Sequence, residues 1–240
     1  MATRTVPRRR VRNERLFFTG MAVTMASIAF IGFIPTYYFA SAFNAPPLVP
    51  LAHLHGVVLS AWMVLYLVQN GLVFADRRDL HRWLGSVGAG LAIVVFVVGV
   101  WLAIDSGHNM RGPPGRDQPT FLINPLVNIV WFAVLAAAAV WRRAESATHK
   151  RLMLLATVAL VTTPLARISH MLGSSAPPPI GGMVLSDLLL IALIVFDLRQ
   201  RGRLHPVTLW VGAAFVLSQP LRVVVSRTDA WQAIARTLLA

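Results

Sequence analysis

The residues that could carry chemistry stand inside long apolar segments, where a polar side chain is costly. Two arginines, Arg167 and Arg222, and one acid, Asp187, interrupt these segments. A charge within a membrane-spanning helix needs a partner or a function, because hydrocarbon does not solvate it. Two cations against one anion leave a surplus positive charge. Such a surplus suits an anionic or carbonyl-bearing amphiphile, such as a lipid headgroup, a quinone or a haem propionate.

Helical spacing brings other polar residues near these charges. Arg167 and His170 share one face of the segment 150–172, and Asn124 and Asn128 share a face of the segment 121–141. The interior charges and amides all stand in the same half of their segments. We therefore predict a polar cavity in the outer half of the bilayer that binds a lipophilic or amphipathic ligand. The predicted ligand-binding residues are His55, Trp62, Asn124, Asn128, Arg167, His170, Asp187, Gln219 and Arg222.

The same residues also allow a purely structural interpretation. Arg167 and Asp187 could form an ion pair between two helices, the amides could hydrogen-bond between helices, and Arg222 could extend to the outer interface. The chain would then be a structural subunit or assembly partner of a membrane complex. A third hypothesis is a membrane-embedded enzyme acting on a lipid-like substrate, with Asp187 as acid and His55 or His170 as base or metal ligand. No residue is assigned as catalytic.

The histidines raise two metal hypotheses. His55 and His170, from two different segments, are suited to bind a b-type haem from its two faces. His81, His149 and His205 each stand just before an outward-going segment, and three imidazoles could bind zinc if those segments adjoin. The alternative is that these side chains are interfacial or hydrogen-bonded residues without a metal. The chain has no cysteine, which excludes disulfides, thiolate catalysis and cysteine metal sites.

Composition assigns the chain to the membrane proteins. Of its 240 residues 56% are hydrophobic and 13% are charged, and the mean hydropathy is +0.65. Soluble domains carry about a quarter charged residues. Seven apolar segments are long enough to cross a bilayer, near 16–40, 50–75, 83–104, 121–141, 150–172, 180–198 and 206–226. We therefore predict an all-α, seven-transmembrane helical bundle.

The distribution of arginine and lysine predicts the orientation of this bundle. Basic residues concentrate before the first segment and in every second loop, at Arg4, Arg8, Arg9, Arg10, Arg12, Arg15, Arg77, Arg78, Arg82, Arg142, Arg143, Lys150, Arg151, Arg199, Arg201 and Arg203. The other side carries only Arg111, Arg116, Arg227 and Arg236. Because cytoplasmic loops are rich in Lys and Arg, the N-terminus is predicted in the cytoplasm and the C-terminus outside, in the periplasm. Asp197, at the inner end of the segment 180–198, is expected to belong to the interface.

These observations divide the chain into three regions. A basic cytoplasmic tail covers 1–15, a transmembrane domain covers 16–228, and a short outer tail covers 229–240. The first apolar segment is interpreted as a retained span, not a cleaved signal peptide. Asp229 could cap a short amphipathic helix in the tail, and a frayed terminus is the alternative. The apolar face of that helix would consist of Trp231, Ile234, Ala235 and Leu238.

Several phrases of the chain resemble a known family. They are HLHGVVLSAWMVLYLVQN, HRWLG, HKRLMLLATVALVTTPLARI and HPVTLWVGAAFVLSQPLR. Together they are similar to a family of uncharacterised bacterial polytopic, seven-span membrane proteins, over most of the chain beyond residue 45. The resemblance implies a multi-pass protein of a bacterial inner membrane and no particular activity. The expected partners are the lipid bilayer, a lipophilic small molecule and a membrane-protein partner; the net charge of +13 is explained by basic loops that face anionic lipid, without nucleic acid.

Overall fold

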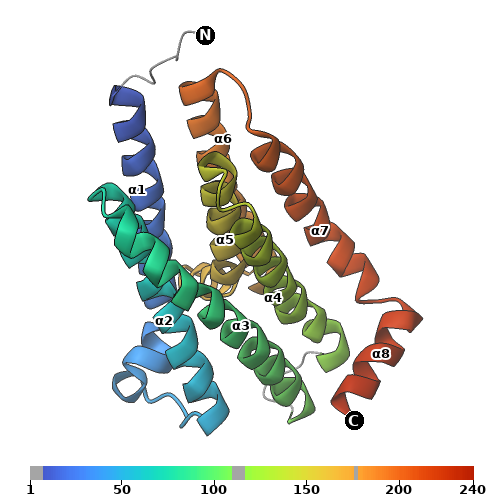
Figure 1. Ribbon diagram of the computed structural model, residues 1–240. Helices are drawn as coiled ribbons and strands as arrows, with labels where there is room; N and C mark the ends of the chain where they lie inside the picture. Colours follow the sequence, from blue (N-terminus) through green and yellow to red (C-terminus); the bar gives the residue numbers. More distant parts are fainter. Residues whose placement is uncertain (1–7, 110–116, 176–177) are drawn as a thin grey trace.

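The computed structural model describes residues 8–109, 117–175 and 178–240, and within these ranges the chain is helical and has no β-strand (Figure 1). The elements are α1 (Arg8–Phe33), the π-helix η1 (Ile34–Tyr38), the 3-10 helix η2 (Ala40–Phe43), α2 (Pro50–Phe74), α3 (Arg78–His108), α4 (Gln118–Trp141), α5 (Ser146–Met171), α6 (Pro178–Arg201), the π-helix η3 (Val207–Val211), α7 (Gly212–Val225) and α8 (Asp229–Leu239). In this part of the chain, seven helical stretches are long and apolar enough to cross a membrane. The predicted all-α bundle of seven apolar helices is thereby confirmed. Arg4, Arg111 and Arg116 of the predicted charge pattern lie outside the described residues.

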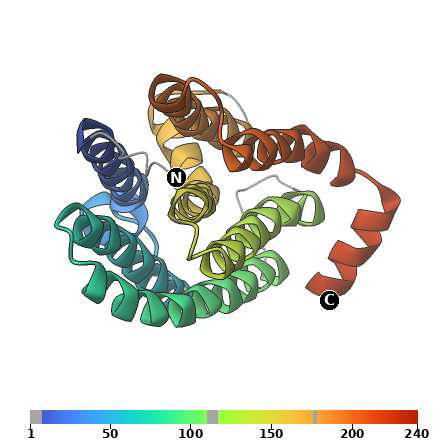
Figure 2. The ribbon, with the colours of Figure 1, turned by 45° about the horizontal axis from the view of Figure 1, so that its top comes forward.

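Helix α5 forms the centre of the bundle. It packs against α1, α4 and α6, and α2 and α3 complete an arc of helices from α1 to α4 (Figure 2). Leu154, Val158 and Val161 of α5 are completely buried. Helix α5 is therefore surrounded mainly by protein along most of its length, whereas Arg167 and His170 near its end are exposed.

Two glycines allow neighbouring helices to approach α5 closely. A Cβ atom at Gly32 of α1 would lie 2.6 Å from the Cβ of Pro164, and a Cβ at Gly182 of α6 would collide with the carbonyl oxygen of Thr162. Neither position can accept a larger side chain without moving a helix. Pro164 also lacks the N–H group that would bond to the carbonyl of Leu160, so it interrupts the hydrogen-bond ladder of α5 at this contact.

The basic ends of the helices gather at one end of the bundle. Arg15 of α1 forms an ion pair with Asp76 in the turn after α2, at 2.7 Å, and Lys150 of α5 forms one with Glu14 of α1, at 2.6 Å. The turns 75–77, 142–145 and 202–206 belong to this end, which we call the basic end. Helices α1 and α3 begin earlier than predicted, at Arg8 and Arg78, because the helical conformation continues through the charged residues that flank each apolar segment.

The tail folds back as helix α8 against the opposite end of the bundle. Thr228, not Asp229 as predicted, is the N-cap, and its hydroxyl accepts a hydrogen bond from the Trp231 amide at 3.3 Å. The Trp231 indole donates to the carbonyl of Pro119 at 2.8 Å, and Ala235 is completely buried. Of the predicted apolar face, Trp231 and Ala235 turn toward the bundle, whereas Ile234 and Leu238 are 54% and 41% exposed. The side chain of Leu239 covers Gly107 of α3.

Candidate ligand-binding cavity

A cavity of about 710 Å³ lies in the half of the bundle away from the basic end. Its walls come from the ends of α1, α3 and α5 and from the beginnings of α2, α4 and α6. Helix α7 contributes Arg222 near its own end. Six of the nine predicted ligand-binding residues line this one cavity, namely His55, Asn124, Asn128, Arg167, His170 and Arg222. Residues from four helices that are distant in sequence, α2, α4, α5 and α7, are thus brought together around one space.

Arg222 is buried in the wall between α4 and α7. Its side chain is only 3% exposed, so it does not extend to the interface as the structural interpretation required. Nη1 donates to Oδ1 of Asn128 at 2.7 Å, while Nε and Nη2 donate to the carbonyl and hydroxyl oxygens of Ser218 at 3.3 and 3.2 Å. The Ser218 hydroxyl also accepts from the indole of Trp131 at 3.0 Å. All of these acceptors are neutral, so the guanidinium charge is hydrogen-bonded but not compensated.

Arg167 occupies the rim of the cavity on the side of α1. Its Nη1 donates to the hydroxyl of Thr36 at 3.0 Å, and its guanidinium lies 4.7 Å from the ring centre of Phe33. The side chain is exposed, in contrast to that of Arg222. Within the described residues Arg167 forms no ion pair, so the predicted alternative of an Arg167–Asp187 pair between α5 and α6 is not found.

The charges that line the cavity are unbalanced. Arg167 and Arg222 are both present, and the described lining contains no aspartate or glutamate. Most other lining side chains are apolar or aromatic, including Leu59, Met63 and Phe121. Cavities that bind small molecules commonly combine such apolar walls with a few convergent polar groups.

The two candidate haem ligands both border the cavity. His55, from α2, is half-buried, and its Nδ1 atom is buried without a hydrogen-bond partner. His170, from the last turn of α5, is exposed. An unpartnered buried nitrogen needs a donor or another partner, because burial removes its water. His55 is therefore the histidine whose surroundings most favour contact with a ligand, and a b-type haem between the two rings stays a prediction.

Three predicted residues lie elsewhere. Asp187 accepts a hydrogen bond from the amide of Gln219 at 2.8 Å, and this pair joins α6 to α7 outside the described cavity wall. Trp62 is 2% exposed and packs edge-on against Phe132, with ring centres 4.7 Å apart. Helical spacing placed Trp62 on the face of His55, but its neighbour Met63 lines the cavity instead. Spacing along one helix does not reveal which neighbouring helix each residue meets.

One wall of the cavity was not predicted. It is formed by the π-helix η1, whose residues were predicted as the end of the first apolar segment, 16–40. Tyr38 shares a 2.7 Å hydrogen bond with Ser60 of α2, and the ring of Tyr37 occupies the space that a Cβ at Gly56 would fill. The signal in the sequence is Pro35, which cannot donate to the preceding turn and favours a wider one. π-helical turns occur frequently at functional sites.

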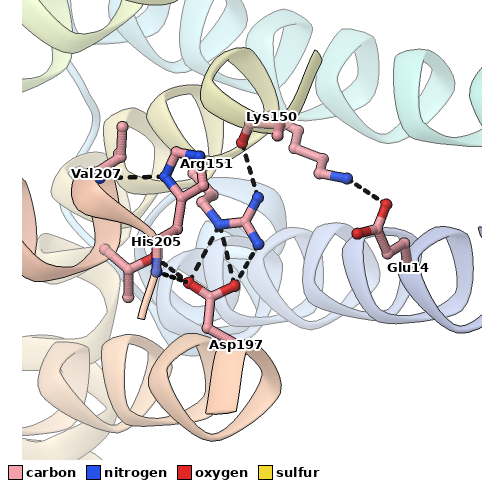
Figure 3. Close-up of polar contacts among 8 residues, drawn as sticks. Glu14, Lys150, Arg151, Asp197, His205 and Val207 are labelled. Atoms are coloured by element: carbon pink, nitrogen blue, oxygen red, sulfur yellow. Dashed lines mark hydrogen bonds and ion pairs between the residues drawn. The ribbon is translucent and has the colours of Figure 1, made fainter. Parts of the chain in front are cut away.

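A second polar cluster, at the basic end, corrects two predictions (Figure 3). Arg151 and Asp197 were expected at the cytoplasmic interface, yet both side chains are completely buried and form an ion pair. Asp197 also accepts hydrogen bonds from the His205 amide at 3.1 Å and from the Thr208 hydroxyl at 2.6 Å. Nη1 of Arg151 donates to the carbonyl of Ala147 at 2.8 Å. Every partner belongs to the chain, so the Arg151–Asp197 cluster is closed.

The three candidate zinc ligands are also at the basic end. The rings of His81 and His149 are neighbours, with centres 6.3 Å apart, and Nδ1 of His149 lies 2.8 Å from the carbonyl of Ala139. His205 belongs to the Arg151–Asp197 cluster, where its Nδ1 accepts from the Val207 amide at 3.2 Å. Within the ranges that the structure describes, no three histidine or acidic side chains are grouped so as to hold a metal ion.

Comparison of the chain with protein-family models, with curated proteins and with solved structures finds no match.

Proposed function

We propose that this protein binds a lipophilic or amphipathic ligand in the cavity between its helices. The observation that carries the proposal is the convergence of six predicted polar residues on one mainly apolar cavity, with two cations and no described acid in its lining. A polar residue inside a membrane protein is costly and is kept where it has a partner or a function. The cavity volume of about 710 Å³ falls in the range of small-molecule sites.

We further propose that the protein lies in a bacterial inner membrane with its basic end in the cytoplasm. The support is the positive-inside rule, because the ends of the helices that carry most arginines meet at one end of the bundle. The cavity then opens toward the outer half of the bilayer, and α8 lies at the outer surface with Ile234 and Leu238 toward lipid.

Ligand binding is favoured over the proposed enzyme because of the position of Asp187. An acid that acts with His55 or His170 on one substrate must face the same cavity. Asp187 is bonded to Gln219 and is absent from the described lining, so this arrangement does not bring the three groups to one substrate.

The proposal is tested by filling the cavity. Ala103 of α3 lines the cavity, so Ala103→Phe should reduce the amount of small molecule that co-purifies with the protein, as measured by mass spectrometry after extraction. Val97→Phe on the same helix is the control, because Val97 is 53% exposed and lies outside the described cavity wall. Equal amounts of co-purified molecule in both variants, with wild-type unfolding temperatures, would contradict binding in the cavity.

The orientation is tested separately by single cysteines, since the chain has none of its own. A cysteine at Arg143, in the turn after α4, should resist a membrane-impermeant maleimide added to intact cells. A cysteine at Arg227, in the turn before α8, should react with it. The reverse pattern would invert the proposed topology.

A further inference from the structure

We propose that the ligand carries an oxyanion, a carboxylate or a phosphate, on an acyl chain, and that Arg222 binds this oxyanion. The inference rests on the proposed function and specifies the chemical class of the ligand. It separates an acidic amphiphile from neutral carbonyl compounds such as a quinone, which the cavity alone does not distinguish.

The Arg222 guanidinium has more donors than the chain uses. A guanidinium has five N–H donors. Its three nitrogens each make one hydrogen bond here, to Asn128 and Ser218, which leaves two donors. The side chain is 3% exposed, so solvent does not supply the missing partners. A buried cation with neutral acceptors alone is strongly disfavoured unless an anion is close.

Among the residues that the structure describes, no acidic side chain forms an ion pair with Arg222. Asp197 forms an ion pair with Arg151 at the other end of the bundle, and Asp187 accepts a hydrogen bond from Gln219 outside the cavity wall. No described acidic residue lines the cavity. The counter-ion of Arg222 must therefore arrive with the ligand. A neutral carbonyl would add one more neutral acceptor to those of Asn128 and Ser218, and it would leave the charge uncompensated.

The two arginines of the cavity differ in their surroundings. Arg167 is exposed at the rim, where headgroups and water can solvate it, and it also lies over the ring of Phe33. Arg222 has neither compensation. Arg167 belongs to α5 and contacts Thr36 and Phe33 on the side of α1, whereas Arg222 belongs to α7. Helices α1 and α7 lie on different sides of α5 (Figure 2). Arg222 is thus the binding residue for the oxyanion, and Arg167 belongs to the rim past which the ligand passes.

The size and lining of the cavity match a single acyl chain. A volume of about 710 Å³ suits one drug-sized molecule, and the side chains of Leu102, Ile129 and Met183 give it an apolar interior. A single acyl chain with an acidic head matches both properties. A diacyl phospholipid would have to leave part of its chains in the bilayer.

The test compares palmitate with methyl palmitate for binding to the purified protein in neutral detergent, by scintillation proximity with radiolabelled ligand. The ester keeps the chain and the carbonyl but has no charge. We expect palmitate to bind at least about tenfold more tightly, the effect of a hydrogen-bonded charge. Equal affinities would overturn the oxyanion inference while cavity binding survives. Absence of saturable binding by both, or binding that Ala103→Phe leaves unchanged, would count against the proposed function itself. Stronger competition by phosphatidate than by unlabelled palmitate would assign the oxyanion to a phospholipid phosphate rather than to a free fatty acid.

The role of Arg222 is tested by Arg222→Gln, with Arg227→Gln as the control. Arg227 is exposed in the turn that follows α7, so its replacement removes the same charge without touching the cavity. Arg222→Gln should abolish the preference for palmitate and retain binding of the ester, while Arg227→Gln should behave as wild type. A preference that persists in Arg222→Gln would overturn the assignment. If Arg222→Gln does not fold, Arg222→Lys is the alternative, because it keeps the charge with fewer donors. This variant should retain a weakened preference for palmitate over the ester. If it binds palmitate as tightly as wild type does, binding through the guanidinium fork is contradicted.

Discussion

The two ends of this bundle treat a buried arginine in opposite ways. At the basic end, Arg151 is completely buried against a carboxylate, and Asp197 is in turn held by the His205 amide and the Thr208 hydroxyl. At the cavity end, Arg222 is almost as buried, but its acceptors are an amide, a carbonyl and a hydroxyl. The first arrangement is complete within the chain and serves stability. The second is incomplete within the chain, and an incomplete buried site indicates a ligand.

The comparison predicts the largest loss of stability at the Arg151–Asp197 cluster. Arg151→Met should lower the free energy of unfolding by about 3–5 kcal/mol, because it leaves the buried Asp197 carboxylate without its counter-ion. Thermal unfolding in detergent measures the effect, and Arg203→Met is the control, since Arg203 is exposed in the nearby turn. The double variant Arg151→Met with Asp197→Leu should recover much of the loss. A double variant no more stable than the single one would show that the cluster contributes more than its charge balance.

A smaller loss is expected at the half-buried ion pair between α1 and α5. Lys150 and Glu14 retain 24% and 27% of their side-chain exposure, so solvent screens their attraction. Lys150→Gln should lower the free energy of unfolding by about 1 kcal/mol or less. The double variant with Glu14→Gln gives the coupling energy. If Lys150→Gln lowers the free energy of unfolding as much as Arg151→Met does, a half-buried ion pair would stabilise the fold as strongly as the completely buried one, contrary to this comparison.

We expect His205 to make a further small contribution to stability that depends on pH. Burial, followed by the nearby Arg151 and Arg201 charges, lowers the pKa of His205, and the Asp197 carboxylate opposes this only in part. The unfolded chain, with a histidine pKa of about 6.5, then binds more protons than the folded one, so stability is full above that pH and falls as the pH drops below it. Asn at position 205 can still accept the Val207 amide but does not titrate. The unfolding temperature of His205→Asn should therefore fall less than that of wild type when the pH is lowered from about 7.5 to 5.5. An equal fall in both proteins would exclude His205 as the source of the pH dependence.

The smallest stability effect is expected where the ligand-binding effect is largest. Without added ligand, Arg222→Gln should change the free energy of unfolding by no more than about 1 kcal/mol, because relief of an uncompensated buried charge offsets the lost hydrogen bonds. Unfolding temperatures of Arg222→Gln and Arg151→Met, measured side by side, test the contrast between the two ends. A loss at Arg222 as large as that at Arg151 would mean that Arg222 is structural.

Much of the cavity was predictable, because its residues follow helical spacing in the same half of their segments. His55, Asn124, Asn128, Arg167, His170 and Arg222 were identified this way, and all six line the cavity. Trp62 was misassigned because residues on one face of a helix can contact different neighbouring helices: His55 borders the cavity, whereas Trp62, about two turns further along α2, packs against Phe132 of α4. Asp187 and Gln219 were assigned to the same cavity on depth alone, and they bond to each other beside it.

The closed cluster was not predictable from the same pattern. Arg151 follows His149 and Lys150 at the start of a helix, where a basic residue normally contacts headgroups, and Asp197 precedes a run of arginines. Their pairing depends on the contact between α5 and α6 and on the turn that carries His205 and Thr208 back over Asp197.

The amino-acid sequence by itself determined the number of long apolar helices, the basic end and the half of the bundle in which the polar residues lie, because these follow from hydropathy and charge along one dimension. Only the tertiary structure decided which arginine found an acid. Ion pairing depends on distances of a few ångströms between different helices, and neither periodicity nor composition contains the rotation of one helix against the next. That rotation gave Arg151 its counter-ion within the chain and left Arg222 with neutral acceptors only.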